Sequence, residues 1–474
     1  MTEVVDTEVG VQSIDAGKFA SGGEETSDKD AEGNFILSID HDPDEAEGVG
    51  FPGGNSGKWG AVFNFVNTIV GAGIIGLPFA VKQCGFVMGM VLLCLTAYLV
   101  DRSAIMLVAA GTKANSLNYE ELMLKGFGPA GLHTFCFFAW FMAFGAMAAY
   151  MIIIADTIPE VMTAAGSSFL DERQEVILVI GTLCILPLSL LKDMSKLAFT
   201  SAASVFADFL IILIVLGTAP GESRDQNVDH SGAFTFIKPT LFAGLGAISF
   251  AFVCQSVTFL VYRSLREPSI GKWSSITHNA IGISWSMTTS LAVIGYLSFV
   301  EETEGDILNN FATTHGPANA ARFLLALTMT FTYPMEMFVA RHVFDASIFR
   351  RLLGCPVNWH YNWRHYGITL SLWLMSMFVA LSTDNLGAVL ELVGAIAASM
   401  LGYILPSMIY LQMHRTELSA ACAKWDKTGP DYVVELTARV MAFQPFFLPF
   451  FMLAFGLVAM LAGTISTFVD EIVG

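Results

Sequence analysis

The chain contains few charged residues, and this narrows the class of protein to which it can belong. Only 14% of its 474 residues are Asp, Glu, Lys or Arg, whereas 54% are hydrophobic. A soluble domain carries about 25% charged residues, so an ordinary soluble fold is excluded and an integral membrane protein is predicted. The chain also lacks a basic cluster of the kind that binds nucleic acid, and we expect no such partner.

Several sequence signals for other classes are also missing. The seven cysteines show neither zinc-site spacing nor a disulfide framework. The first long apolar run starts near Trp59, too far along the chain for a cleaved signal peptide, so we expect the first span to be a signal anchor. No nucleophile with its base, phosphate-binding loop or metal-ligand cluster is visible, which disfavours an enzyme or a primary pump. We predict no cofactor.

Most of the negative charge lies in one N-terminal segment. The formal net charge is −18, and residues 1–57 supply −12 of it, because fourteen acidic residues there face only Lys18 and Lys29. A segment this acidic and this poor in apolar residues is typical of a disordered tail. We predict a disordered cytoplasmic tail over 1–57, with a cytoplasmic partner left open, followed by a membrane domain over 58–474.

Eleven apolar runs are long enough to cross a bilayer as helices. With the N-terminus in the cytoplasm, 19 of the 24 Lys and Arg residues fall on the cytoplasmic side, which satisfies the positive-inside rule. The C-terminus is then extracellular or lumenal. The runs lie at about 59–81, 86–109, 132–155, 175–191, 197–217, 238–261, 278–299, 319–340, 366–382, 387–412 and 443–468.

The first span carries helix-breaking residues at its centre. Gly71, Gly73, Gly76 and Pro78 follow one another within it. Glycine lowers helix propensity and proline removes a backbone donor, so we expect the helix to unwind inside the membrane. Unwound backbone at that depth is typical of a substrate site lined by protein or water. Close packing of a neighbouring helix against the small residues is the alternative.

The sixth span has a similar design, with Gly244, Gly246 and Ser249 ahead of Gln255. Broken helices at corresponding positions predict a five-plus-five repeat. Because five is odd, the second copy enters the membrane from the opposite side, and the repeat is inverted. A chance pair of glycine-containing helices is the alternative. The copies cover about 59–217 and 238–412, with an extra helix at about 443–468.

Three motifs carry a resemblance to a known family. They are NTIVGAGIIGLPF from Asn67, SFAFVC from Ser249 and TYPME from Thr332. These motifs resemble the amino acid/auxin permease family, and most closely its sodium-coupled neutral amino acid transporters. The resemblance extends from about Trp59 to the last span. It implies the inverted-repeat fold of the bacterial sodium–leucine symporters, with sodium- or proton-coupled uptake of amino acids.

The resemblance implies a substrate site at the two breaks. Backbone amides in the first break are expected to bind the carboxylate of an amino acid, aided by the half-helix dipole. The sixth span is expected to line the side-chain pocket if it unwinds near Ser249. Many relatives have histidine where this chain has Gln255, which puts their substrate preference and pH response in doubt here. The expected contacts are Gly71, Ala72, Gly73, Ser249, Phe250, Phe252 and Gln255.

The resemblance also implies a sodium site between the first and eighth spans. Sodium is a hard cation that binds several oxygen atoms. The implied ligands are the carbonyls of Val66 and Val70, the side chain of Asn67 and the hydroxyl of Thr332, with Thr328 as a lesser candidate. For Thr332 the alternative is a hydroxyl that bonds a carbonyl of its own helix.

Asp208 lies near the middle of the fifth span, with no basic residue close to it in that span. An ionisable group at such depth is a functional candidate by default. It is expected to carry a coupled proton or to face the amino group of a substrate. A structural hydrogen bond to a neighbouring helix is the alternative.

We therefore predict a multi-pass secondary active transporter that couples sodium to the uptake of small neutral amino acids by alternating access. A proton-coupled amino acid transporter and a transporter-like sensor that signals through its tail are the alternatives. A channel is disfavoured because rings of polar residues are not evident. The plasma membrane and an endolysosomal or vacuolar membrane are both compatible with the sequence.

Overall fold

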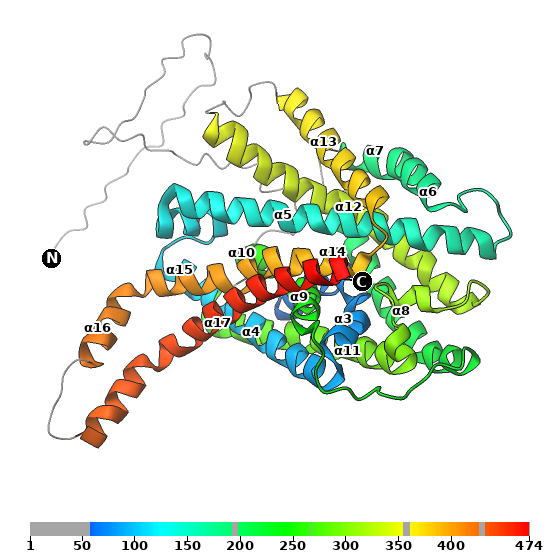
Figure 1. Ribbon diagram of the computed structural model, residues 1–474. Helices are drawn as coiled ribbons and strands as arrows, with labels where there is room; N and C mark the ends of the chain where they lie inside the picture. The colour runs from blue at the N-terminus through cyan, green and yellow to red at the C-terminus, as the bar shows by residue number, and fades with distance from the viewer. Residues whose placement is uncertain (1–56, 192–197, 267, 354–360, 426–431, 474) are drawn as a thin grey trace, which may run out of the picture. The chain divides into compact units, whose positions relative to one another are not determined.

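The computed structural model describes residues 57–191, 198–266, 268–353, 361–425 and 432–473. All regular elements in these ranges are helices (Figure 1), which confirms the predicted all-α class. The acidic tail predicted over 1–57 lies outside the described residues, apart from Gly57.

Nine helical segments within the described ranges are long and apolar enough to cross a membrane. The runs expected at 59–81 and 175–191 are not among them. The expected count of eleven is therefore not confirmed. The nine segments are Phe86–Lys113, Tyr119–Ala164, Ala203–Asp225, Leu241–Ser264, Ile270–Glu302, Gly316–Ile348, Asn362–Ser382, Leu386–Met413 and Gln444–Val469.

The first run is broken at the predicted place. It comprises α2 (Lys58–Ile69), the short 3₁₀ turn η1 (Ala72–Ile74) and α3 (Leu77–Cys84). The helix ends because Val70 turns to an extended conformation, with φ −84° and ψ 101°. Pro78 lies in the first turn of α3, where its missing N–H costs no helical hydrogen bond.

The fourth run is divided by a π-helical turn, η2 (Gly181–Ile185), between α6 (Arg173–Ile180) and α7 (Leu186–Ser189). The indole of Trp373 donates a hydrogen bond of 3.0 Å to the carbonyl of Gly181. A π-helical turn loosens the regular ladder, so this carbonyl can accept a bond from another helix.

The sixth run is also broken, but not where the sequence predicts. Helix α9 (Leu241–Phe252) stays regular through Ser249, and the break falls at Val253 and Cys254. The turn η4 (Gln255–Val257) and α10 (Thr258–Ser264) follow. The expectation of unwinding near Ser249 is therefore wrong.

The remaining helices complete the membrane body. Helix α5 contains the non-helical residue Gly128, with φ 66°, near its start. The remaining helices are α4 (Phe86–Lys113), α5 (Tyr119–Ala164), α8 (Ala198–Asp225), α11 (Ile270–Phe299), α12 (Gly316–Phe344), α13 (Tyr361–Ser382), α14 (Leu386–Val393), α15 (Leu405–Met413), α16 (Arg415–Trp425) and α17 (Tyr432–Val473). The π-helical turns η8 (Gly394–Ala398) and η9 (Met400–Ile404) join α14 to α15.

The helices pack as two groups. In one group, α11 contacts α2, α3 and α4, and α9 contacts α3 and α4. The helices α5, α12 and α13 form a second group, in which α5 and α12 lie side by side (Figure 1). Helix α8 contacts α11 and α12, and α14 contacts α9 and α5. The broken helices therefore belong to the first group. They lie beside α8 and α14, which contact helices of both groups.

One arginine joins three helices. Arg173, at the start of α6, pairs with Asp156 of α5 at 2.7 Å. Its two terminal nitrogens donate to the carbonyls of Ala380 at 2.8 Å and Thr383 at 2.9 Å, at the end of α13. Charge-assisted bonds of this kind are stronger than neutral ones, so Arg173 fixes the ends of these helices together.

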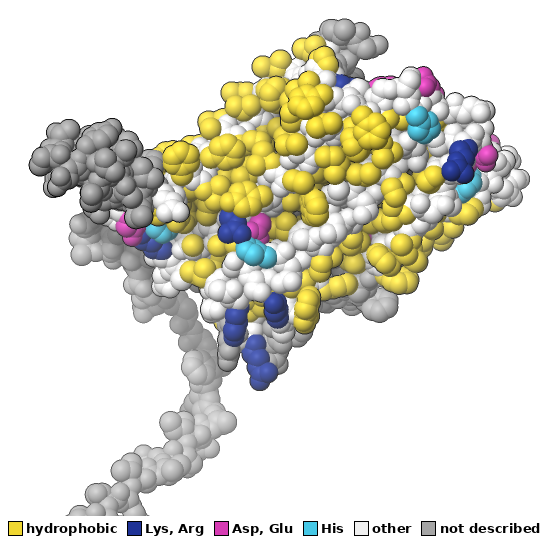
Figure 2. All heavy atoms as spheres, turned by 90° about the horizontal axis from the view of Figure 1, so that it is seen from below, with side chains coloured by type: hydrophobic (Ala, Val, Ile, Leu, Met, Phe, Trp, Pro, Cys, Tyr) yellow, Lys and Arg dark blue, Asp and Glu magenta, His cyan; other side chains and the backbone are white. Residues whose placement is uncertain are grey.

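The exterior suits a bilayer. Figure 2 shows apolar side chains over a broad continuous area of one face. Leu183 and Phe378, each 70% exposed, are among the large apolar residues at the surface of the described chain. In water such a surface would aggregate, and in lipid it is expected.

Candidate functional site

The two broken helices touch at the first break. A Cβ atom added to Gly73 would lie 2.7 Å from the Cα of Ala251 and 3.2 Å from the Cδ1 of Phe250. Real Cβ atoms do not approach backbone this closely, so only glycine fits. The structure thus brings together the first-span and sixth-span residues that the sequence assigns to one site.

The first break also borders open space. A Cβ added to Gly71 would meet no described atom within 4 Å, and this residue is half-exposed. The carbonyl of Gly71 accepts a hydrogen bond of 3.1 Å from the amide of Ile74. The backbone near Gly71 can therefore be approached by a ligand, whereas Gly73 is covered by α9.

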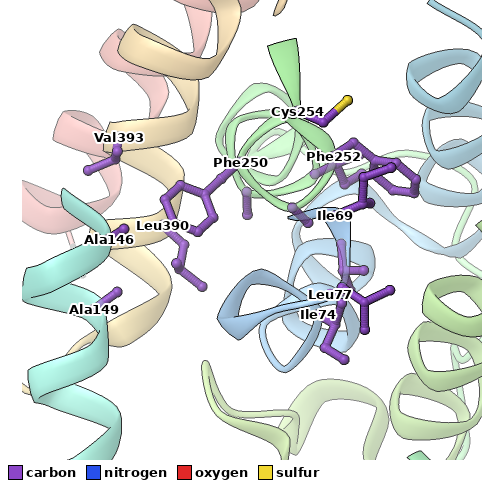
Figure 3. Packing of buried hydrophobic residues seen from close by; sticks show 14 of the residues in the cluster. Ile69, Ile74, Leu77, Ala146, Ala149, Phe250, Phe252, Cys254, Leu390 and Val393 are labelled. Carbon is purple, nitrogen blue, oxygen red and sulfur yellow. The ribbon is translucent and has the colours of Figure 1, made fainter. Parts of the chain in front are cut away.

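Phe250 and Phe252 do not line one common pocket. Both are buried, and Figure 3 shows Phe250 pointing toward Leu390 and Ala146, while Phe252 points to the other side of α9, toward Ile69. Because α9 is still helical here, residues two apart face opposite ways. Of the two aromatic side chains, Phe250 is the one near Gly73.

Ser249 has a partner that the sequence analysis missed. The hydroxyl of Tyr403, in the π-helical turn η9, donates a hydrogen bond of 3.3 Å to Ser249 Oγ, and both residues are buried. In the sequence, Tyr403 is one aromatic residue in a long apolar run. The π-helical turn that orients it leaves no sequence signal that could have identified it.

The side-chain amide of Gln255 forms hydrogen bonds that stabilise the second break. Its Oε1 accepts a hydrogen bond of 3.0 Å from the amide of Cys254, and its Nε2 donates to Ser103 Oγ of α4 at 3.2 Å. Ser103 in turn donates to the carbonyl of Gly402. The fully buried Gln255 side chain therefore ties the break to α4 and η9.

The implied sodium ligands of α2 lie beside a polar stripe. Asn64, Asn67, Thr68 and Gly71 are all half-exposed, and their spacing puts them on one face of the helix. The carbonyl of Val66 accepts the amide of Val70 at 2.8 Å. This carbonyl therefore keeps one lone pair for an ion.

Thr332 takes the alternative hydrogen bond weighed for it. Its hydroxyl donates to the carbonyl of Thr328 at 2.8 Å, and Thr328 itself donates to the carbonyl of Leu325. A hydroxyl that gives its proton to the helix still presents oxygen lone pairs to a cation. Helix α12 packs chiefly on α5 and α8, and α2 on α11 and α10, so the implied ligands come from helices with different neighbours.

Asp208 is buried in α8, with 4% of its surface exposed. Within the part of the chain that the structure describes, we find no ion pair or hydrogen bond to its carboxyl group. The structural hydrogen bond considered for Asp208 is therefore not seen among these residues.

Two broken helices in contact inside a helical membrane body define a class, that of the membrane transporters with discontinuous helices. The fold agrees with that of a Na⁺-coupled sialic acid symporter solved in a substrate-bound outward-open state, with a TM-score of 0.51 and 14% identity. The match covers 88% of this chain and 90% of the symporter. It shows the fold alone.

The chain belongs to the transmembrane amino acid transporter family, whose model matches residues 54–469. A rat protein with the provisional name sodium-coupled neutral amino acid transporter 11 is 34% identical, over 76% of this chain and 79% of its own. Vacuolar amino acid transporter 2 of Saccharomyces cerevisiae is 31% identical, over 87% and 84%. Sodium-coupled neutral amino acid symporter 2 of Danio rerio is 27% identical, over 85% and 84%. The predicted family is confirmed, and the protein is not an enzyme.

Proposed function

We propose that this protein is a secondary active transporter that couples sodium to the uptake of small neutral amino acids. The contact between Gly73 and Ala251 carries the proposal, because it sets the first helix break against the second broken helix, two residues before the break in that helix begins. Paired breaks of this kind form substrate and ion sites in transporters. The names of the rat and zebrafish relatives support sodium and a neutral amino acid.

The substrate carboxylate would bind the backbone amides of Gly71, Ala72 and Gly73. Free N–H groups and the half-helix dipole both favour an anion there. The open space at Gly71 leaves room for this approach. The substrate side chain would then lie toward Phe250 and Ser249.

Sodium would bind where α2 ends. The carbonyls of Val66 and Val70 and the side chain of Asn67 would supply oxygen ligands, and Thr332 would add its hydroxyl as α12 closes on α2. The hydrogen bond from Thr332 to the carbonyl of Thr328 is compatible with this role, because the hydroxyl oxygen keeps lone pairs for the ion.

Alternating access would move the two helix groups against each other. The group of α2, α3, α4, α9 and α11 is tied internally, for example by Trp273 Nε1 of α11, which donates to the carbonyl of Ala104 at 3.1 Å. The α5–α12–α13 group would be the other rigid part. A contact at Gly73 without intervening side chains would let the site open and close by small shifts.

Proton coupling through Asp208 is the second candidate. It is favoured by one observation, the burial of this carboxyl group with no partner among the described residues. A transporter-like sensor that signals through the acidic tail is a further alternative for the same membrane domain. The N-terminus would be cytoplasmic, in either the plasma membrane or a vacuolar or endolysosomal membrane, as the yeast relative's name suggests.

Uptake by purified protein in liposomes tests the proposal. Radiolabelled neutral amino acids would be supplied with an inward sodium gradient at equal pH, or with an inward proton gradient without sodium. We expect accumulation only with sodium. Accumulation that needs only the proton gradient would favour the second candidate, and no accumulation under either gradient would reject coupled transport.

A further inference from the structure

A separate cavity of about 300 Å³ lies where α3, α5, the α11–α12 connection and the start of α14 meet. It shares no residue with the site at the helix breaks. In the proposed orientation it opens on the extracellular or lumenal side. Its charged lining residues are Lys82, Asp156, Glu302, Glu304, Asp306 and Asp384.

The charge of this cavity is not balanced. Asp156 is neutralised by Arg173. Lys82 donates to the carbonyl of Thr303 at 3.1 Å and lies over the ring of Phe79. Among the described residues, no lysine or arginine forms an ion pair with any of the other four carboxylates. The cavity therefore presents an excess of negative charge to its occupant.

Asp306 is the feature that points to a ligand. It is 1% exposed, and its Oδ1 accepts a hydrogen bond of 2.9 Å from the amide of Leu308. Its Oδ2 is buried and has no hydrogen-bond partner within the described ranges, and the same holds for Oδ1 of Asn309 in the same turn. An acceptor buried without a partner costs about 1–3 kcal/mol, and more when it is charged. Both missing partners are hydrogen-bond donors.

The arrangement of the side chains does not favour a metal ion as the ligand. In the described parts of the chain, no group of three or more His, Cys, Asp or Glu residues is placed to hold a metal ion. The volume instead fits a small organic molecule. A carboxylate on that molecule would face unpaired carboxylates, and Lys82 is the one basic residue among the described residues that line the cavity.

We propose that this cavity binds a small organic cation, whose ammonium or guanidinium N–H groups donate to Asp306 Oδ2. Such charge-assisted hydrogen bonds are about twice as strong as neutral ones. Exposed Glu302 and Asp384 on the cavity wall attract the cation. The residues that line this cavity are distinct from those proposed to bind sodium or the transported substrate.

The position of the cavity gives its occupant an influence on the broken helix. A Cβ added to Gly76, just before α3, would lie 3.4 Å from the carbonyl of Gly305. A Cβ added to Gly305 would in turn lie 2.7 Å from the amide nitrogen of Gly387, so Gly305 packs against the backbone of α14. A bound cation therefore lies between elements that must separate if α3 moves.

Calorimetric titration tests the site without requiring transport. Full-length protein in lipid nanodiscs would be titrated with agmatine, which carries an ammonium and a guanidinium group but no carboxylate, at pH 8. We expect binding to the wild type, and affinity at least about tenfold weaker for Asp306→Asn, equivalent to about 1.4 kcal/mol. Asp171→Asn, the same change at an exposed residue outside the cavity, should bind as the wild type does.

Two outcomes would overturn the proposal. One is the absence of agmatine binding to the wild type, and the other is equal affinity of the wild type and Asp306→Asn. If Asp306→Asn does not fold, the exposed Glu302→Gln and Asp384→Asn variants take its place. Wild-type affinity in both of them would then reject the site.

Discussion

Gly73 shows how strongly one residue can be constrained in this fold. The atoms that an added side chain would strike are backbone atoms of α9, which cannot rotate away as a side chain could. The need for glycine here is therefore steric. It comes from the contact between two helices, and not from an unusual backbone conformation at this position.

Substitution of Gly73 by valine should abolish uptake without preventing insertion. The β-branched side chain would push η1 away from α9, and misplacement of a site by about 1 Å can cost about a hundredfold in rate. We expect uptake to fall at least about tenfold. Gly60→Val is the matched control, because a Cβ at Gly60 meets no described atom within 4 Å. Surface labelling would confirm insertion, and normal uptake by inserted Gly73→Val would reject the site.

Thr332 offers a test of the ion. Thr332→Ala would remove one oxygen from a site with few ligands, so the apparent sodium affinity should weaken about tenfold, or about 1.4 kcal/mol. The apparent substrate affinity at saturating sodium should change much less. Thr330→Ala is the control, because Thr330 donates to the carbonyl of Ala326 on another face of α12. Uptake would be measured against sodium concentration at fixed pH.

The opposite result would identify Asp208 as the coupling group. Uptake that is independent of sodium, stimulated by acid and unchanged in Thr332→Ala would exclude a sodium site at that residue. Loss of this uptake in Asp208→Asn would then assign the coupling role to Asp208.

Asp306 makes stability depend on pH. Burial raises the pKa of its carboxyl group to about 7, the charges of Asp156 and Glu304 add to this, and the amide of Leu308 and the charge of Arg322 oppose it. A carboxyl group with a raised folded pKa stabilises the fold below its unfolded pKa of 3.8, and this contribution is lost as the pH rises through 7.

Asp306→Asn should therefore gain thermal stability relative to the wild type as the pH rises from 5 to 8. The variant carries no ionisable group at this position, so only the wild type loses stability over this interval. Thermal unfolding of both proteins in the same detergent at the two pH values measures the difference. An equal difference in Tm at both values would contradict the prediction.

At the scale of elements, the positions of glycine and proline correctly predicted the break in the first span, but they did not predict where the sixth span breaks. Gly71 to Pro78 mark a segment that does unwind. Gly244 and Gly246 instead allow close packing, since a Cβ on Gly244 would lie 2.6 Å from the carbonyl of Ala80, and one on Gly246 would collide with the carbonyl of Glu391. At the second break, the side chain of Gln255 bonds the neighbouring amide of Cys254 and also Ser103, which lies 152 residues away in the sequence.

The site could be predicted only in part for the same reason. Local composition indicates that a helix breaks, but a one-residue shift in a helix turns each side chain by about 100°. The orientations of Phe250 and Phe252 therefore depended on the exact place of the break. Tyr403 depends on a π-helical turn, which composition does not reveal.

At the scale of the molecule, apolar length predicted eleven spans, and nine of these runs correspond to helical segments of the described ranges that are long and apolar enough to cross a membrane. The runs at 59–81 and 175–191 are not among these nine segments. Loop charge predicts the orientation of the body in the membrane, and this prediction can be tested directly.

Cysteine labelling from one side of the membrane tests the orientation. A cysteine at exposed Glu301 should react with an impermeant reagent added outside cells or to the lumenal side. A cysteine at exposed Arg415 should react only after permeabilisation. The background would lack the exposed Cys422. The reverse pattern would overturn the predicted topology.

Arg173 has a consequence for the order in which the chain is made. Its partner Asp156 is synthesised just before it, whereas the carbonyls of Ala380 and Thr383 come 207 and 210 residues later. At about 5–20 residues per second, the guanidinium waits roughly 10–40 s for these two acceptors. The start of α6 therefore settles only when α13 has left the ribosome, so the first half of the body finishes its assembly after much of the second half has been synthesised.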